Sequence, residues 1–408
     1  VGAIAIAKIS FPLSMTQQKL MDKLNRIARE NLTGVRVIRA FRKDEYESGR
    51  FRDTNEQYAA ASRRLFKLMS SAQPLFFFLL NIAVLAIFWI SSTKINTGDL
   101  QVGQLVAFLE YQFHAMFSMM LFSLVFVMYP RAEISARRIK ELLDEEPLIQ
   151  NPRNPVTAGD GSGTLVFDHV SFQYPDGEAP VLRDITFEAR RGDTIAFIGS
   201  TGSGKSTLIN LIPRFYDISS GSIRIDNVDV RRYDLKALRE KIGFIPQKAL
   251  LFTGSINENI RYGKHNAVQT EVEHSAKVAQ AYDFITEKPK QFEEMIEEGG
   301  GNVSGGQRQR LSIARAVVRK PDIYIFDDSF SALDFKTDAN LRKQLKYETK
   351  DAITLIVAQR VTSIMDATRI IVLNEGAVVG IGTHRELLKT CSIYHEIALS
   401  QLSEEELA

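Results

Sequence analysis

The sequence has very little cysteine and almost no net charge. Its 408 residues include one cysteine, Cys391, which excludes an internal disulfide framework and a cysteine-rich zinc site. A chain of this kind suits a reducing compartment. The formal net charge of +2 gives no indication of a nucleic-acid partner, and none is expected. The length predicts two or three domains.

The sequence also lacks an initiating methionine and a basic leader before its first apolar run. Residues 1–13 read VGAIAIAKISFPL. A secretory signal would place basic residues ahead of such a run. We interpret this run as the tail of a membrane helix and expect the chain to be truncated at its N-terminus. A buried helix of a soluble domain is the alternative.

A polar stretch with helical periodicity extends from Gln18 to Lys67. Its apolar residues recur at helical spacing among many lysines and arginines, which is typical of a solvated stalk. Gly34–Phe41 (GVRVIRAF) interrupts the pattern with a glycine and alternating apolar residues. We expect a short turn or cross-helix there, at the far end of a helical hairpin.

Two long apolar runs follow, Leu75–Ile90 and Leu105–Tyr129, separated by a polar hairpin at Ser91–Gln104. A transmembrane helix needs about twenty apolar residues, so both are predicted spans. Basic residues gather at the ends away from the hairpin. They are Arg63, Arg64, Lys67, Arg131, Arg137, Arg138 and Lys140. The positive-inside rule then places the hairpin outside the cell and both long ends in the cytoplasm. We therefore expect a multi-pass protein of the plasma (inner) membrane.

The second run carries the ionisable residues Glu110 and His114, with Gln112 between them. Ionisable groups inside a bilayer are costly and usually face a cavity or a neighbouring helix. One interpretation is that Glu110 and His114 line a substrate pathway. The other is that they lie near the outer interface or bond a neighbouring helix. We prefer the second interpretation.

A second domain is predicted after a linker at Asp144–Gly163, which is rich in proline, glycine and acids. From Thr164 onward short apolar runs, glycines and helical patterns alternate, which favours an α/β fold. Residues 1–143 are therefore one expected domain and residues 164–408 the other.

The stretch GSTGSGKST follows an apolar run and precedes a helical pattern, so it predicts strand, loop and helix. Glycines let successive N–H groups point at phosphate oxygens, and the lysine reaches the β/γ-phosphates. The serine after the lysine is a ligand for Mg²⁺. An ordinary Gly/Ser loop is the alternative. The expected nucleotide-binding residues are Gly199, Ser200, Thr201, Gly202, Ser203, Gly204, Lys205, Ser206 and Thr207.

Two single residues are weaker candidates. Tyr174 lies at the end of an early strand, where its ring could stack on a purine. Gln247 ends another strand, where its amide could reach Mg²⁺ or an attacking water. An ordinary strand residue is the better interpretation of either one alone.

The apolar strand Ile323–Asp328 (IYIFDD) ends in two acids, the Walker B pattern. Asp327 is expected to hold Mg²⁺, and Asp328 takes the position of the base that orients the attacking water. A surface pair of acids at a strand end is the alternative. The tight turn SALD follows and ends at Asp334, a further expected nucleotide contact.

The most discriminating stretch is VSGGQRQR at residues 303–310, which precedes a helix. The Ser304 hydroxyl and the N–H groups of Gly305 and Gly306 would form a second anion site at that helix N-terminus, followed by Gln307.

With the phosphate loop, VSGGQ makes residues 164–408 closely similar to the nucleotide-binding domain of ATP-binding cassette (ABC) transporters. Residues 1–143 resemble the last part of an exporter-type transmembrane domain, from the end of its fourth helix through its sixth. The resemblance implies an α-helical membrane domain followed by an α/β P-loop ATPase, with ATP and Mg²⁺ as cofactors. It also implies that two such domains sandwich two nucleotides, each signature contacting the γ-phosphate held opposite. GVRVIRAF would dock onto a nucleotide-binding domain, often that of the partner.

Two positions depart from the family pattern. The catalytic glutamate after the Walker B aspartate is Asp328, and the switch histidine is Gln359. Asp is one methylene shorter than Glu, and a misplacement on the order of 1 Å can lower a rate ~10²-fold. Gln has no titratable proton. This combination resembles the subunit of a heterodimeric bacterial multidrug exporter that contributes a degenerate nucleotide site.

The sequence thus favours one half of an ATP-driven exporter of amphipathic or lipid-like compounds. Its expected partners are a second, different half-transporter and the lipid bilayer. The alternatives are a homodimeric exporter or lipid flippase, a soluble ABC ATPase, and a regulatory subunit that never hydrolyses ATP.

Overall fold

The computed structural model describes residues 2–402, and it describes their side chains except at 2–8, 72, 120, 122–127, 129–131 and 335. The chain divides into two compact units, Val1–Glu146 and Pro147–Ala408. The first is helical and the second is α/β, which confirms the predicted order of the two fold classes.

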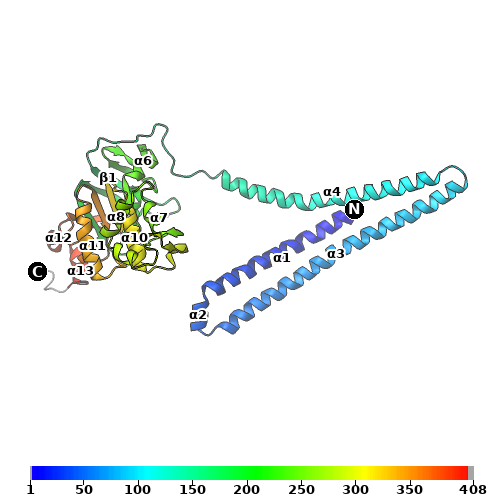
Figure 1. Ribbon diagram of the computed structural model, residues 1–408, viewed down its shortest axis with the longest axis horizontal. Helices are drawn as coiled ribbons and strands as arrows, with labels where there is room; N and C mark the ends of the chain where they lie inside the picture. The colour runs from blue at the N-terminus through cyan, green and yellow to red at the C-terminus, as the bar shows by residue number, and fades with distance from the viewer. Residues whose placement is uncertain (1, 403–408) are drawn as a thin grey trace. The chain divides into compact units, whose positions relative to one another are not determined.

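The first unit contains α1 (Gly2–Thr33), α2 (Val35–Ala40), α3 (Asp44–Asn96) and α4 (Val102–Leu143). Figure 1 shows α1 and α3 side by side as a hairpin, with α2 at the closed end. Ile27 of α1 is fully buried, and Arg50 of α3 forms an ion pair with Glu30 at 2.8 Å. The short helix α2 confirms the cross-helix expected at GVRVIRAF. A side chain at Gly34 would meet the Glu30 carbonyl at 2.8 Å, which explains the glycine at the break.

The helix α3 contains the predicted span Leu75–Ile90, and within the described residues it is the one helix long and apolar enough to cross a membrane. The second predicted span, Leu105–Tyr129, lies within α4 and stays a prediction. Glu110 and His114 are one helical turn apart there, with 3.7 Å between Oε1 and Nε2. The connection between α3 and α4 is shorter than the predicted hairpin, because both helices extend into it. At the start of α4 the Gln104 side-chain oxygen accepts from the Gln101 N–H at 2.9 Å.

Residues 144–163 contain no helix or strand, and one isolated bridge pairs Val156 with Tyr233. The second unit, as far as it is described, then contains three sheets. A six-stranded sheet has the order β12-β11-β3-β10-β9-β6, a four-stranded antiparallel sheet the order β2-β1-β4-β5, and β7 pairs with β8. The strands are β1 (Thr164–Phe172), β2 (Leu182–Arg190), β3 (Thr194–Gly199), β4 (Ser220–Ile225), β5 (Val228–Asp229), β6 (Ile242–Ile245), β7 (Gly254–Ser255), β8 (Met295–Ile296), β9 (Ile323–Asp327), β10 (Ile353–Val357), β11 (Arg369–Asn374) and β12 (Ala377–Gly382).

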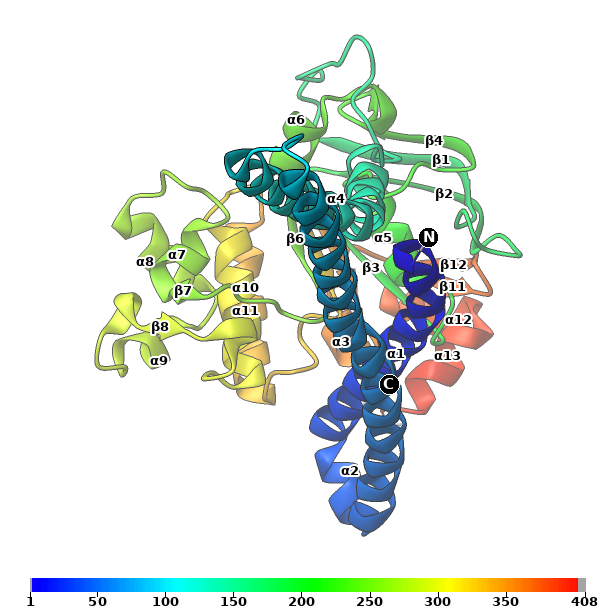
Figure 2. The ribbon, with the colours of Figure 1, turned by 90° about the vertical axis from the view of Figure 1, so that its right-hand side faces the viewer.

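The helices of this unit pack around the sheets, and Figure 2 shows α7, α8 and α9 gathered beside α10. The α-helices are α5 (Lys205–Leu211), α6 (Leu235–Glu240), α7 (Ile256–Arg261), α8 (Gln269–Val278), α9 (Tyr282–Thr286), α10 (Gly305–Val317), α11 (Phe335–Glu348), α12 (His384–Thr390) and α13 (Ser392–Leu399). The 3₁₀ helices are η1 (Val230–Arg232), η2 (Gln291–Glu293), η3 (Glu298–Gly300) and η4 (Val361–Ser363).

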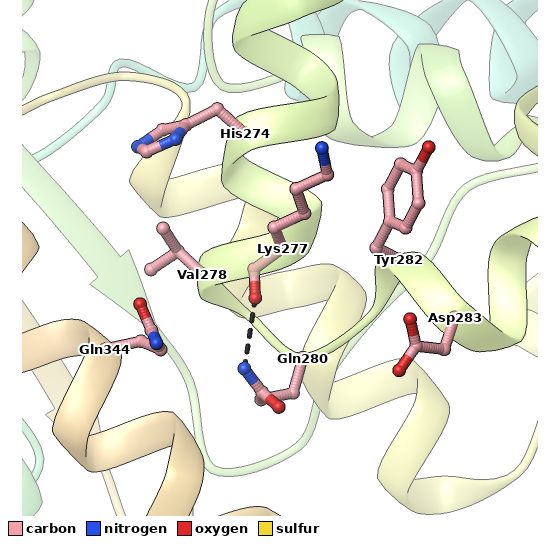
Figure 3. Close-up of a pocket in the computed structure, with 7 residues that line it drawn as sticks. All are labelled: His274, Lys277, Val278, Gln280, Tyr282, Asp283 and Gln344. Atoms are coloured by element: carbon pink, nitrogen blue, oxygen red, sulfur yellow. Dashed lines mark hydrogen bonds between the residues drawn. The ribbon is translucent and has the colours of Figure 1, made fainter.

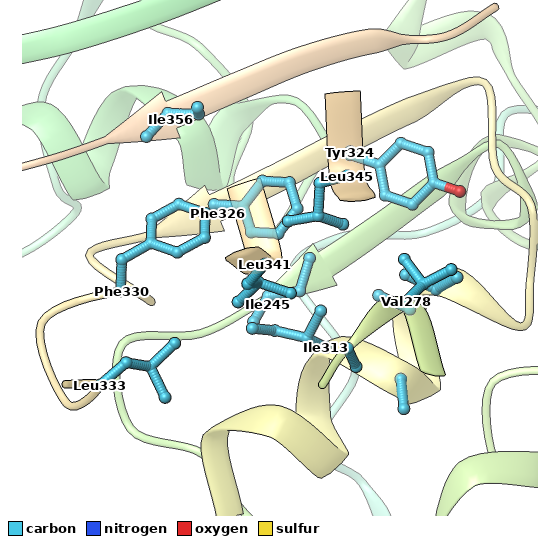
Figure 4. Packing of buried hydrophobic residues seen from close by; sticks show 14 of the residues in the cluster. Ile245, Val278, Ile313, Tyr324, Phe326, Phe330, Leu333, Leu341, Leu345 and Ile356 are labelled. Atoms are coloured by element: carbon cyan, nitrogen blue, oxygen red, sulfur yellow. The ribbon is translucent and has the colours of Figure 1, made fainter. Parts of the chain in front are cut away.

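Hydrophobic side chains cover both faces of the six-stranded sheet. On one face Phe326 and Phe330 pack with Ile313 of α10 and Leu341 of α11 (Figure 4). On the other, alternate residues of the same strands pack against α5 and the antiparallel sheet. Every residue of β9 and β10 is buried, as expected for central parallel strands. Because β6, β9, β10 and β3 are parallel, their carboxyl ends meet at one edge, where polar residues can gather.

Candidate nucleotide site

The phosphate loop connects β3 to α5, which confirms the predicted strand, loop and helix. β3 ends at Gly199, and Gly204 caps α5 in the left-handed conformation with φ of 94°. A Cβ at Gly199 would lie 2.0 Å from the Leu373 carbonyl oxygen, and one at Gly204 would lie 2.7 Å from the Leu182 side chain. Both positions therefore require glycine, and the loop is held tightly against its neighbours.

The Lys205 ammonium group lies inside this loop. Its Nζ donates to the carbonyl oxygens of Gly199 at 2.9 Å and Ser200 at 2.7 Å, and to Ser203 Oγ at 3.3 Å. Burial lowers the pKa of Lys205, and the Asp328 and Asp327 carboxylates oppose that change. Thr201 and Gly202 form the exposed tip of the loop. A charged donor held among loop oxygens is placed to bind phosphate oxygens.

Ser206 and Asp327 meet directly, because the Ser206 hydroxyl donates to Asp327 Oδ1 at 3.0 Å. Asp327 is 8% exposed, and burial raises its pKa, with the Asp328 charge adding to that effect. A buried carboxylate beside a hydroxyl provides the oxygen ligands that Mg²⁺ prefers, with phosphate and water completing the shell. Residues 2–402 contain no cluster of three or more His, Cys, Asp or Glu that could hold a metal by itself. The residues present therefore fit a magnesium ion bound together with a nucleotide.

Asp328 lies beside this pair, and two amide groups bind one of its oxygens. Gln359 Nε2 donates to Asp328 Oδ2 at 2.8 Å, and Gln247 Nε2 donates to the same atom at 3.2 Å. Asp328 has a left-handed backbone with φ of 46°, and its N–H donates to the Val357 carbonyl at 2.9 Å. Burial raises the pKa of Asp328, and the bond from Gln247 opposes this. The three predicted catalytic residues thus converge on one carboxylate.

Tyr174 lies two residues beyond β1 and contacts the helix that follows the phosphate loop. Its hydroxyl is 3.1 Å from Thr207 Oγ1 on α5. Its ring makes edge contacts with Phe172 and Tyr216, at centroid distances of 4.8 and 5.1 Å. The structure therefore brings Tyr174 next to the loop, while its stacking on a purine stays a prediction.

The signature residues form the start of α10, separately from the Walker residues. Ser304 is the N-cap: its Oγ accepts from the Gln307 N–H at 3.2 Å, and Gln307 Oε1 accepts from the Ser304 N–H at 3.0 Å. Ser304 and Gly305 are exposed, and Gly306 is half-buried. Such a reciprocal capping box fixes the first turn of the helix and presents its N-terminus outward.

Asp334 is also an N-cap, at the start of α11. Its carboxylate accepts from the Thr337 N–H at 2.9 Å, and this bond lowers the pKa of Asp334. Its hydrogen bond is thus with its own helix, and its role as a nucleotide contact stays a prediction.

Two residues at this site were missed by the sequence analysis. The Ser331 hydroxyl donates to the Asp328 carbonyl at 2.9 Å and holds the turn after β9. Gln401 bonds the backbone of the Gln359 loop. The serine could have been found from its place in SALD, three residues after Asp328. Gln401 carries no local signal, because it lies 42 residues after its partner.

A cavity of about 310 Å³ lies elsewhere in this unit, between α8, α9 and α11 (Figure 3). Its lining is polar, and Lys277 Nζ lies 4.6 Å from the centre of the Tyr282 ring. The cavity is separate from the cluster around Asp328. The lining residues are His274, Lys277, Val278, Gln280, Tyr282, Asp283 and Gln344.

Comparison with protein families agrees with this geometry. The family model described as ABC transporter matches residues 182–331, which include the phosphate loop, the signature and both Walker B acids. The model described as ABC transporter transmembrane region matches residues 1–120.

Individual relatives match nearly the whole chain. An ABC transporter ATP-binding protein of Mycobacterium tuberculosis is 40% identical over 394 residues, which are 96% of this chain and 67% of that protein. The ATP-dependent lipid A-core flippase of Desulfotalea psychrophila is 33% identical over 95% of this chain and 67% of its own length. The chain thus spans about two thirds of the length of these relatives. A solved bacterial Atm1-family ABC exporter with ATP bound is similar with a TM-score of 0.84 and 28% identity, over 98% of this chain and 72% of that one.

Proposed function

The chain belongs to the ABC transporter family, and on that basis we propose that it is one half of a heterodimeric exporter whose own nucleotide site holds ATP and hydrolyses it slowly. The family couples ATP hydrolysis to transport across a membrane. The likeness to an Atm1-family exporter over both units supports export as the direction. The slow site and the different partner are the specific parts of the proposal.

The surroundings of Asp328 are the main support for slow hydrolysis at this site. In the attacking-water role, a carboxylate must reach the water and take its proton. Both amides donate to Asp328 Oδ2, so one of the two carboxylate oxygens is already engaged and less free to accept from the water. Neither amide can take up a proton at neutral pH. The aspartate side chain is also one methylene short of the usual glutamate, so it reaches less far toward the nucleotide.

This chain provides groups that can bind both the phosphates of a nucleotide and its Mg²⁺. Lys205 can exchange its loop oxygens for phosphate oxygens, while Ser206 and Asp327 supply oxygen ligands for Mg²⁺. When bound, Mg²⁺ would neutralise phosphate charge. Tight binding with slow chemistry is the expected result.

The signature supports action as a dimer. Ser304 and Gly305 are exposed at the start of α10 and complete a site on another chain's Walker motifs, as the family arrangement implies. We propose that the partner carries the usual Walker B glutamate and switch histidine, so that this chain serves the faster site. GVRVIRAF, which includes α2 and has Val37 and Phe41 exposed, would dock on the partner's nucleotide-binding domain.

The cargo is proposed to be amphipathic or lipid-like, in a multi-pass protein of the inner membrane with its nucleotide-binding domain in the cytoplasm. The apolar helix α3 supports membrane insertion. A homodimeric lipid flippase is the second candidate, favoured by the relative that is named a lipid A-core flippase. In that case Asp328 would be an adequate base at two identical sites.

Nucleotide trapping on each chain tests the proposal. The assembled transporter is incubated with Mg²⁺ and an azido-ATP labelled on the γ-phosphate, then crosslinked at intervals. We expect the label to stay on this chain for at least ten times longer than on the partner, and the Lys205→Ala variant to remove it. Equal loss of label from both chains would contradict a slow site.

A further inference from the structure

We infer that Gln401, at the C-terminal end of the α/β unit, is a positioning residue for Gln359 and so for the ATPase site. The inference rests on the proposed function for its catalytic consequence, and on hydrogen-bond geometry for the contact itself. Gln401 is not part of the phosphate loop, the Walker B strand or the signature.

The contact is a two-point clamp on the backbone. Gln401 Nε2 donates to the Gln359 carbonyl at 2.8 Å, and Gln401 Oε1 accepts from the Val361 N–H at 2.8 Å. One side-chain amide thus satisfies a donor and an acceptor two residues apart. The Val361 N–H is the first of η4, and Arg360 at its N-cap provides no side-chain cap for the helix. The start of η4 therefore depends on Gln401 for this bond.

The clamp is itself held in place by the core. Gln401 follows α13, whose Tyr394 and Ala398 are fully buried. The N–H groups of Gln401 and Leu402 both donate to the Ala398 carbonyl, at 3.0 and 2.9 Å, and Leu402 packs against the hydrophobic core. The Gln401 backbone is therefore held in a fixed turn, so little backbone entropy remains to be lost when its amide binds the loop.

The other end of the loop touches the reacting region. Gln359 follows β10, and its side chain donates to Asp328 Oδ2 at 2.8 Å. The Gln359 side chain is exposed, so the surrounding protein does little to hold it in place. The position of its amide relative to Asp328 therefore depends on where the Gln359 backbone lies. The clamp thus connects the C-terminal turn to the Asp328 carboxylate through one residue. Because a displacement on the order of 1 Å can lower a rate ~10²-fold, a smaller shift of this backbone is enough for a severalfold change.

Two measurements on Gln401→Ala test the inference, with Ser400→Ala as the matched control. Ser400 lies in the same turn, and its hydroxyl bonds the Ile397 carbonyl rather than the loop. In hydrogen exchange of the assembled transporter, we expect peptides covering residues 358–363 to exchange about tenfold faster in Gln401→Ala, because the Val361 N–H loses its acceptor. Residues 392–399 should keep their protection, and Ser400→Ala should match the wild type. Unchanged exchange at 358–363, or loss of protection throughout α13, would overturn the inference.

The second measurement is single-turnover hydrolysis in a Ser304→Ala background, which leaves this chain's Walker site as the active one under the proposed function. We expect Gln401→Ala to lower the rate about fivefold, with the ATP dissociation constant changed less than twofold. In a Gln359→Ala background it should have no further effect, since it acts through that side chain. An equal loss in both backgrounds would overturn the inference. If this chain's Walker site hydrolysed no ATP at all in the Ser304→Ala background, the slow hydrolysis of the proposed function would be contradicted, while the exchange result would still decide the role of Gln401.

Discussion

The cluster around Asp328 and the signature at Ser304 are two candidate nucleotide-binding regions of one unit, and they differ in how they relate to the family pattern. The Asp328 cluster is partly buried, draws on three strand ends, and has two departures, Asp328 and Gln359. The signature is exposed, is capped by its own helix, and follows the pattern in full. Under the proposed function, this chain keeps the groups that serve a nucleotide on another chain and has changed two groups that act on its own nucleotide.

We expect the largest effect from restoring the glutamate and the histidine that the family pattern has at these two positions. In Asp328→Glu with Gln359→His, the carboxylate gains reach and the switch position gains a titratable imidazole. We expect single-turnover hydrolysis at this chain's site to rise by about 10²-fold. Rapid-quench measurement on the assembled transporter checks this, with Asp351→Glu, at an exposed position outside the site, as a control. An unchanged rate in the double variant would mean that the two departures are not what slows the site.

The next largest effect separates binding from chemistry. Lys205→Ala removes the buried ammonium group, and a charge-assisted bond to phosphate contributes about 1.5–3 kcal/mol. We expect ATP affinity at this chain's site to fall by about 10- to 10²-fold, measured by titration with a fluorescent ATP analogue. Lys236→Ala, at an exposed position on α6, is the matched control. If both variants bound ATP like the wild type, Lys205 would not contact the phosphates.

Much of this site could be predicted from short stretches of sequence. GSTGSGKST and IYIFDD each carry their signal locally, because strand, loop and helix patterns lie within about ten residues. The convergence of Gln247 and Gln359 on one oxygen of Asp328 could not be predicted in the same way. Those residues are 81 and 31 positions from Asp328, and they meet through the register of parallel strands.

In the helical unit, too, one feature could be predicted from the sequence and another could not. The break at Gly34 was predicted from a local glycine, and it is the start of α2. The length of the connection between α3 and α4 was overestimated, because polar residues at 91–96 and 102–104 continue the helices instead of forming a loop. Polarity alone does not end a helix when the backbone bonds can continue.

The smallest effect concerns stability and its dependence on pH. Burial raises the pKa of Asp327 in the folded state, so the ionised carboxylate destabilises the fold at neutral pH. Asp327→Asn keeps an oxygen that accepts from Ser206 and should raise stability at pH 7.5 by about 1 kcal/mol. The gain should shrink as the pH falls through the raised pKa toward the ordinary aspartate value, where the wild-type carboxyl becomes neutral. Thermal unfolding of the full protein across this range provides the measurement, and a gain that grew on acidification would contradict the assigned direction of the pKa.

The most direct test of the central claim compares Asp328→Asn with Ser304→Ala in the assembled transporter, by steady-state ATPase activity under saturating ATP. We expect Asp328→Asn to leave more than about half of the activity, because under the proposed function this chain's site contributes little to turnover. We expect Ser304→Ala to lower the activity about tenfold or more. If Asp328→Asn removed the activity as completely as Ser304→Ala, Asp328 would be a working base and the slow site would be excluded.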